Sequence, residues 1–333
     1  NSLMFGLMLV GTVLSSCLSN TGTAARLLPV ALGICSAAKI PASRQLMPLA
    51  FACGWGGIIT MVGTPPNIIA TGALKAAGLP TFSFFEFAWI GIPLSLAGML
   101  YMMFIGKYLL PKVELSADQE IAQEIEAKTT STSKQMISGA ILLLVVITMA
   151  IGIPGITLEM AAVIGAIVCV LTGCLTEKQA YGSIDWVTIF LFAGMMPIAT
   201  SMDKTGAGAL IADWTVGLMG GTPSPMVVTA VLFLLSCTLT QFMSNTAASA
   251  LLCPIGLAIA KQLGADPKAV VMAIAVAASC AFATPVGTPP NTLVLGPGNY
   301  KFMDYVKAGV PLVIVSFIVS IIIIPMVWPF FPA

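Results

Sequence analysis

Two short polar motifs repeat inside a chain that is otherwise apolar. Ser19-Asn20-Thr21 is followed by Gly63-Thr64-Pro65-Pro66-Asn67. The same pair returns 225 and 224 residues later as Ser244-Asn245-Thr246 and Gly287-Thr288-Pro289-Pro290-Asn291. Order and spacing are kept to within one residue, which indicates an internal duplication. The fold must therefore bring together two related halves, each with two polar interruptions.

The composition is that of a protein buried in a lipid bilayer. Hydrophobic residues make up 58% of the chain and charged residues 8%, with a net charge of +1, whereas soluble domains carry about 25% charged residues. Several apolar runs approach or exceed the ~20 residues that cross a bilayer: 84–110, 135–152, 158–174, 186–201 and 306–329. We expect an all-α polytopic membrane protein, with lipid as a partner and no nucleic acid.

Residues 3–38 and 225–262 each read as a re-entrant helical hairpin. An apolar leg of about 15 residues leads to the polar tip, and a second apolar leg follows. Each leg is expected to be too short to cross the membrane. Irregular backbone at membrane depth is tolerated only where it is buried in protein or lines a cavity. The tips should therefore face the protein interior.

Residues 45–78 and 268–299 are predicted to be broken helices. The Pro-Pro pair in each removes two N–H donors and ends the helix before it. Carbonyls at the end of the first half and N–H groups at the start of the second are then left without helical partners. A kink that serves packing alone is the alternative, but both copies keep the flanking Gly, Thr and Asn.

The only sustained polar segment, 112–134, is predicted to be a cytoplasmic linker between a first repeat, 1–111, and a second repeat, 135–333. The second tip is preceded by more than a hundred residues of the second repeat, and the first tip by only 18 residues. We therefore expect that the chain lacks the N-terminal helices of its first repeat.

Basic residues predict the orientation. If Lys39 and Arg44 are cytoplasmic, nine basic residues fall inside and four outside, which puts the C-terminus outside. The two hairpins then enter from opposite faces, which is the inverted-repeat pattern of secondary transporters. We expect a multi-pass protein of the bacterial cytoplasmic (inner) membrane.

The tips and breaks can supply the neutral oxygen ligands that hard cations prefer. Ser15 and Thr240 each lie four residues before a tip serine, on the same helix face. Two equivalent cation sites are predicted. The chain has no His, and no acidic residue lies beside either motif. Because proton-coupled carriers usually place carboxylates or His along the path, sodium coupling or anion exchange is favoured.

The same groups can hold an anion between helix N-termini. The candidate hydrogen-bond donors to it are Asn20, Thr21, Thr64, Asn245, Thr246 and Thr288. Arg26 lies two turns beyond Ser19 and is a possible anion contact. Its alternative role is to reach into the cytoplasmic vestibule, and its repeat counterpart is Leu251.

With these motifs the chain resembles the divalent anion:sodium symporter family, which includes sodium–dicarboxylate, citrate and sulfate cotransporters. The resemblance implies an elevator-type transporter that is dimeric through a scaffold domain, with Na⁺ as the coupling ion and no organic cofactor. It implies one sodium site at Ser15, Ser19, Asn20 and Gly63, and another at Thr240, Met243, Asn245 and Gly287. The substrate would lie between the donors named above, with Pro65 and Pro289 shaping the wall.

Two departures leave the substrate open: Thr23 has no hydroxyl counterpart at Ala248, and Arg26 is unusual beside such a tip. A C4-dicarboxylate such as succinate is expected first, then citrate or sulfate. The alternatives are a sodium-independent dicarboxylate or tricarboxylate exchanger and a sodium–sulfate symporter. An enzyme or membrane scaffold is a third class. An enzyme needs a nucleophile–base pair or metal cluster, and the sequence shows neither.

Overall fold

The computed structural model describes residues 2–111, 132–151, 153, 155–184 and 224–331, with scattered positions between 186 and 217. All regular elements in this described part are helical, so the predicted all-α fold class is confirmed. Positions 112–131 of the predicted linker 112–134 lie outside the described residues. Much of the predicted helix 186–201 also lies outside them.

The element order of the first repeat returns in the second. The first repeat contains α1 (Ser2–Cys17), α2 (Asn20–Ala38), η1 (Ala42–Arg44), α3 (Leu46–Gly56), η2 (Gly57–Ile59), α4 (Pro65–Ala76), α5 (Ala88–Tyr101), the π-helical η3 (Met102–Gly106) and α6 (Lys107–Leu109). The second contains α13 (Pro225–Leu239), α14 (Asn245–Gln262), α15 (Pro267–Ala278), α16 (Pro289–Leu295) and α17 (Phe302–Val327). Both run as a helix pair, two half-helices and a long helix.

Serine caps explain why each polar tip starts a new helix. Ser19 is the N-cap of α2, and its hydroxyl accepts a hydrogen bond from Gly22 N at 3.1 Å. Ser244 caps α14 in the same way and accepts from Ala247 N at 3.1 Å. Each cap satisfies a backbone donor that has no partner inside its helix.

The length of α2 corrects one expectation. We expected each leg of the hairpin to be too short to cross a membrane. However, α2 has 19 residues and is long and apolar enough by length and composition. The helix is longer than expected because it begins at the tip residue Asn20 itself and continues through Pro29.

Each half-helix pair is interrupted at its proline motif. Thr64 and Thr288 are extended N-caps, with φ −146° and −147°, and a Pro-Pro pair occupies the first positions of α4 and α16. Proline is tolerated there because the first N–H groups of a helix have no helical partner in any case. The proline pairs therefore begin the second half-helices as well as ending the first.

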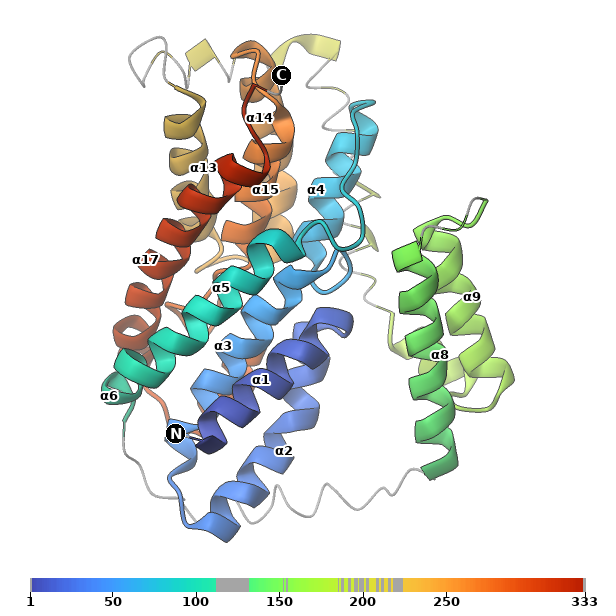
Figure 1. Ribbon diagram of the computed structural model, residues 1–333, viewed down its shortest axis with the longest axis vertical. Coiled ribbons are helices and arrows are strands. Elements are labelled where there is room, and N and C mark those ends of the chain that lie inside the picture. Colours follow the sequence, from blue (N-terminus) through green and yellow to red (C-terminus); the bar gives the residue numbers. More distant parts are fainter. Residues whose placement is uncertain are drawn as a thin grey trace. The chain divides into compact units, whose positions relative to one another are not determined.

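Residues 1–119 and 190–333 group into one compact domain, and the first half-helices form its core. Every residue of α3 is buried, and so is α15 from Ala269 onward. Phe282, just after α15, contacts Phe51 and Trp55 of α3, with ring centroids 5.3 and 6.1 Å apart. Figure 1 shows α1 and α2 towards one end of this domain and α13 and α14 towards the other.

The repeats also pack crosswise. The second helix of each pair lies against the second half-helix of the other repeat, α2 on α16 and α14 on α4. The long helices α5 and α17 pack together and expose apolar side chains at four-residue spacing, such as Ile314, Ile318 and Ile322 of α17. Such a stripe is typical of a helix that faces lipid. The first half-helix α3 also packs on α1 and α2, and α15 packs on α13 and α14.

A separate compact unit, residues 120–189, contains α8 (Thr132–Ile151), α9 (Leu158–Leu171) and α10 (Glu177–Gly182). Within it α8 packs on α9. Both helices expose most of their apolar side chains, and α8 is long and apolar enough to cross a membrane.

Candidate functional site

The first tip and the first break meet in a cluster of oxygen atoms. Ser15 is fully buried, and its Oγ lies 2.8 Å from Asn20 Oδ1 and 2.7 Å from Cys53 O. Cys53 belongs to the last turn of α3, where the helix dipole places partial negative charge on the carbonyls, and Cys53 O also accepts the Gly57 N–H. Gly63 O completes the cluster from the unwound segment. We call Ser15, Asn20, Cys53 and Gly63 the first oxygen cluster.

The second repeat builds the same arrangement. Thr240 is fully buried, and its Oγ1 lies 2.8 Å from Asn245 Oδ1 and 2.6 Å from Ala278 O. Ala278 is the last residue of α15. Gly287 O lies beside the same amide. Thr240, Asn245, Ala278 and Gly287 form the second oxygen cluster, and each residue matches one of the first at the repeat offset.

The asparagine side chains have an oxygen that faces other oxygens. With its amide turned over, Asn20 would donate to Ser15 Oγ at 2.8 Å, Cys53 O at 3.0 Å and Gly63 O at 3.2 Å. Asn245 would do the same towards Thr240 Oγ1, Ala278 O and Gly287 O. Two arrangements relieve the repulsion in each cluster: a donating amide nitrogen, or a cation held by the amide oxygen and its neighbours. Both clusters can therefore hold a cation without any charged ligand.

Glycines are required where the backbone comes close to the clusters. A Cβ on Gly57 would overlap Asn20 Oδ1, and one on Gly63 would overlap Gly57 O. In the second cluster a Cβ on Gly287 would lie 2.7 Å from Thr240 O. The break and the tip can approach each other only because these positions have no side chain.

Some predicted sodium ligands have a different environment. Ser19 is exposed, and its hydroxyl accepts the capping hydrogen bond from Gly22 N. Met243 is partly exposed and lies in the turn before Ser244. The predicted ligands that the structure brings together through hydrogen bonds or close contact are Ser15, Asn20, Gly63, Thr240, Asn245 and Gly287.

The predicted anion contacts lie at the starts of four helices. Asn20 and Thr21 begin α2, Asn245 and Thr246 begin α14, and Thr64-Pro65 and Thr288-Pro289 lie at the starts of α4 and α16. Thr21 is exposed and Thr246 partly exposed. Neither Thr64 nor Thr288 makes a side-chain cap hydrogen bond, and the buried Thr64 Oγ1 has no partner. A buried hydroxyl without a partner is costly unless a ligand or water satisfies it.

Arg26 is exposed on α2, one turn beyond the buried Thr23. Thr23 Oγ1 is also buried without a hydrogen-bond partner. Neither feature has a counterpart in the second repeat, where the equivalent residues are Leu251 and Ala248.

Sequence reasoning missed the backbone oxygens of the clusters and the residues that hold them in place. Cys53 and Ala278 contribute carbonyl oxygens, and any residue type can do so. Thr60 and Thr284 hydrogen-bond to the ends of the first hairpin legs, at Ser16 O and Gln241 O, and the motif asparagines hold the breaks. Asn67 Nδ2 donates to Thr60 O at 2.8 Å, and Asn291 Nδ2 to Thr284 O at 2.9 Å. A signal for the threonines existed, because the repeat extends to Thr60-x-Val62-Gly63 and Thr284-x-Val286-Gly287.

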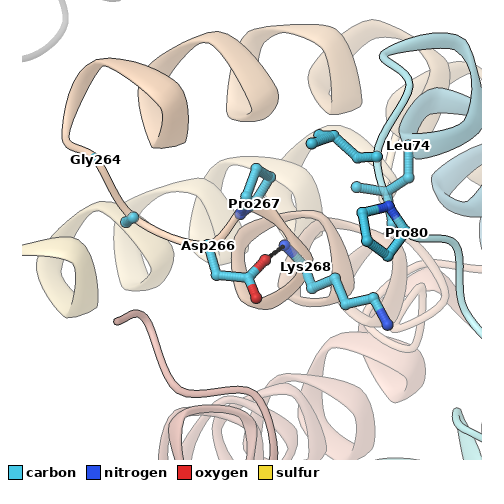
Figure 2. Close-up of a pocket in the computed structure, with 8 residues that line it drawn as sticks. Leu74, Pro80, Gly264, Asp266, Pro267 and Lys268 are labelled. Carbon is cyan, nitrogen blue, oxygen red and sulfur yellow. Dashed lines mark hydrogen bonds between the residues drawn. The ribbon is translucent and has the colours of Figure 1, made fainter. Parts of the chain in front are cut away.

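A cavity of about 510 Å³ lies elsewhere, at the turn between α14 and α15. Figure 2 shows Asp266, Pro267 and Lys268 at the start of α15 on one side and Leu74 and Pro80 on the other. None of the residues that line it belongs to an oxygen cluster. Among the described residues no group of three or more His, Cys, Asp or Glu side chains could hold a metal ion. The oxygen clusters are thus the candidate site on chemical grounds.

Comparison with solved structures supports the fold. The structure of the YdaH transporter of Alcanivorax borkumensis, described as having an unusual topology, superposes with a TM-score of 0.67. The alignment covers 99% of this chain and 86% of that one, at 15% identity. At this identity the likeness concerns the fold alone.

Curated relatives are described as transporters. YfbS of Escherichia coli, an uncharacterized transporter, is 48% identical over 49% of this chain. An uncharacterized transporter of Haemophilus influenzae is 32% identical over 97% of it. SdcS of Staphylococcus saprophyticus, a sodium-dependent dicarboxylate transporter, is 24% identical over 98% of it. The chain spans only part of these proteins, from 27% of the first to 72% of the second.

The citrate transporter family matches residues 1–251 and 242–332, which together are almost the whole chain. This match and the SdcS relatives confirm the resemblance to divalent anion:sodium symporters that the motifs predicted. The family and these relatives are transporters, in agreement with the expectation that the chain is not an enzyme. The chain belongs to the citrate transporter family.

Proposed function

We propose that this chain binds the ions of a sodium-coupled carrier for a small divalent anion. One observation carries the proposal: in both repeats an asparagine amide lies beside a buried hydroxyl and two backbone carbonyls. Carbonyls at half-helix ends and unwound segments are the usual ligands of sodium in transporters with broken helices. The two oxygen clusters are therefore the proposed sodium sites.

Sodium fits these clusters better than a proton does. The ligands are hydroxyl, amide and carbonyl oxygens, and none of them titrates near neutral pH. The chain contains no His, and neither cluster includes an acidic residue. A proton-coupled carrier needs a titratable group on its path. The sodium dependence of the SdcS relatives points in the same direction.

The proposed anion site uses the helix starts beside the clusters. Asn20, Thr21, Asn245 and Thr246 would donate from the tips, and Thr64 and Thr288 from the breaks, with Pro65 and Pro289 beside them. The unpartnered Thr64 Oγ1 supports this assignment. Bound sodium ions would balance the anion's charge. A C4-dicarboxylate such as succinate is the first candidate, because the SdcS relatives are dicarboxylate transporters.

Citrate and sulfate remain alternative substrates, and the name of the matching family favours citrate among them. A sodium-independent exchanger of dicarboxylates or tricarboxylates is the other functional alternative. It would need the tips to hold the anion without a bound cation. The neutral oxygens gathered around Asn20 and Asn245, which suit a bound cation, favour the symporter over this exchanger.

The proposal extends to the whole carrier. The domain with the oxygen clusters would move across the membrane with its ions, as in an elevator, against a scaffold through which two copies form a homodimer. The protein would lie in the bacterial inner membrane with its C-terminus outside, because this orientation leaves most basic residues in the cytoplasm.

Uptake into proteoliposomes tests this function. The purified protein should accumulate labelled succinate when sodium is high outside, and replacing sodium by potassium should abolish uptake. Unlabelled citrate and sulfate should be tested as competitors to rank the anions. Uptake that is independent of the sodium gradient but requires internal dicarboxylate would instead establish the exchanger. No uptake of any of the three anions, from a protein that still binds sodium, would contradict the anion assignment.

A further inference from the structure

Two buried threonines connect the first leg of each hairpin, just before its tip, to the broken helices. Thr60 precedes Gly63 by three residues and is 1% exposed. Its hydroxyl donates a 2.5 Å hydrogen bond to Ser16 O, the carbonyl next to Ser15 in the chain. The bond thus joins the unwound segment of the first break to the end of α1, one residue from the hydroxyl of the first oxygen cluster.

The second repeat has the same connection. Thr284 precedes Gly287 by three residues, and its Oγ1 donates to Gln241 O at 2.6 Å. Gln241 is the residue after Thr240, just as Ser16 follows Ser15. Thr284 Oγ1 also accepts a hydrogen bond from Gly287 N at 3.1 Å. One hydroxyl therefore holds both the tip and the glycine whose carbonyl belongs to the second oxygen cluster.

The threonines are themselves held in place by the motif asparagines. Asn67 Nδ2 donates to Thr60 O at 2.8 Å, and Asn291 Nδ2 donates to Thr284 O at 2.9 Å. Both asparagines are fully buried. In each repeat a continuous path therefore runs from the start of the second half-helix, through the threonine, to the hairpin.

These bonds matter because each oxygen cluster is assembled from two elements. The hairpin supplies a hydroxyl and the amide, while the broken helix supplies two carbonyls. Ligands on separate elements bind a cation tightly only if their separation is fixed before the cation arrives. Residues that orient metal ligands without touching the metal typically contribute 10- to 100-fold to metal affinity.

We propose that Thr60 and Thr284 are positioning residues for the two cation sites, each acting through one hydrogen bond to its hairpin. This inference rests on the proposed sodium sites. It attributes part of their sodium affinity to two residues that are not themselves sodium ligands. The valine variants Thr60→Val and Thr284→Val keep the shape of the side chain but remove the hydroxyl.

Two other threonines provide matched controls. Thr71 Oγ1 donates to Asn67 O at 2.8 Å, and Thr229 Oγ1 donates to Pro225 O at 2.8 Å. Both bonds stay within one helix, α4 or α13, and reach no oxygen cluster. Thr71→Val and Thr229→Val therefore remove a comparable hydroxyl without separating a tip from its break.

The experiment measures the half-saturating sodium concentration, the maximal uptake rate and the sodium-free melting temperature for each variant. Thr60→Val and Thr284→Val should raise half-saturating sodium roughly 10- to 100-fold, with the maximal rate at saturating sodium within about twofold of wild type. Thr60→Ser and Thr284→Ser should restore the wild-type value, because they keep the hydroxyl. The two control variants should leave it unchanged.

A purely structural role would lower the sodium-free melting temperature and leave half-saturating sodium as in the controls, and that result would overturn the inference. Failure of the serine variants to restore sodium affinity would overturn it as well. If one valine variant does not fold, half-saturating sodium can still be compared among the other valine variant, both serine variants and wild type. A wild-type protein without any sodium response would instead refute the proposed function itself.

Discussion

At the scale of single residues, the proposed cation sites depend on the side-chain amides of Asn20 and Asn245. Each amide has an oxygen and a nitrogen of nearly the same shape, so either can face the surrounding oxygens. The nitrogen satisfies those oxygens when no cation is bound. With a cation bound, the amide oxygen can share the cation with them instead. We therefore expect each amide to present its nitrogen without a cation and its oxygen with one.

Glycine at position 57 gives a residue-scale prediction. Its missing side chain allows Asn20 to approach the end of α3, and a Cβ there would overlap Asn20 Oδ1. Gly57→Ala should therefore displace the amide and weaken the sodium response of the first cluster by about tenfold or more, as a loss of roughly 1.4 kcal/mol implies. The measurement is the sodium concentration that half-saturates the rise in melting temperature.

Gly33→Ala is the matched control, because a Cβ on Gly33 in α2 meets no atom within 4 Å. It should leave the sodium response unchanged. If Gly57→Ala behaved like Gly33→Ala, the close approach of Gly57 to Asn20 would have no part in sodium binding.

At the scale of elements, the two broken helices are held at opposite ends by different chemistry. At one end Tyr300, just before α17, donates from its hydroxyl to Ser43 O at 2.6 Å and accepts from Met47 N at 2.8 Å. At the other end Glu86, just before α5, pairs with Lys268 at 3.1 Å and accepts from Trp328 Nε1 at 2.7 Å. The first connection is neutral, whereas the second is ionic.

The ionic connection should respond to pH. Burial raises the pKa of Glu86, but hydrogen bonds from Trp328, Ser83 N and Lys268 outweigh it and hold the pKa below its usual value of 4.5. A carboxyl with a depressed pKa stabilises the fold above its usual pKa, and the contribution is lost as pH falls through the folded-state value. Glu86→Gln should therefore lower the melting temperature by a few degrees at pH 7.

The difference between Glu86→Gln and wild type should shrink as the pH falls below about 4.5, because wild type then loses the same charge. Glu177→Gln, at the start of α10, removes a carboxylate that lies outside this connection. That control should show a smaller effect at pH 7. An unchanged difference down to pH 3 would contradict the role given to the charge of Glu86.

The elements that the sequence predicted best are those with a local chemical cause. A Pro-Pro pair favours the first positions of a helix, so the starts of α4 and α16 were visible in the motifs, whereas the serine caps of α2 and α14 were found only in the structure. The ligand set was less visible. Cys53 and Ala278 contribute only carbonyls, and their place in the clusters depends on how α3 and α15 pack against the tips.

The same reasoning applies to Ser19, whose hydroxyl accepts a hydrogen bond from the backbone of its own helix. Ser19 carries a hydroxyl at the tip, so the family resemblance implied a sodium ligand. The start of α2 needs a cap, however, and the Ser19 hydroxyl serves it. The length of α2 was underestimated for a related reason, because the polar tip residue Asn20 is already part of the helix. The hydrogen bonds that a helix start requires from nearby side chains are not evident from a motif alone.

At the scale of the whole molecule, the two compact units should respond differently to sodium. Both oxygen clusters belong to one unit, whereas α8 and α9 belong to the other. Hydrogen–deuterium exchange should show sodium-dependent protection at residues 15–23, 53–64, 240–248 and 278–288. Exchange in α8 and α9 should change little. Protection confined to α8 and α9 would show that sodium acts on the other unit, and it would contradict the proposed sodium sites.

Sodium binding at equilibrium tests the central claim most directly. Radioactive sodium should bind the purified wild-type protein at two sites per chain. Asn20→Ala and Asn245→Ala should each leave one site, and the double variant should leave none, since each change removes the amide oxygen of one cluster. Two sodium ions bound by the double variant, with wild-type affinity, would contradict the account.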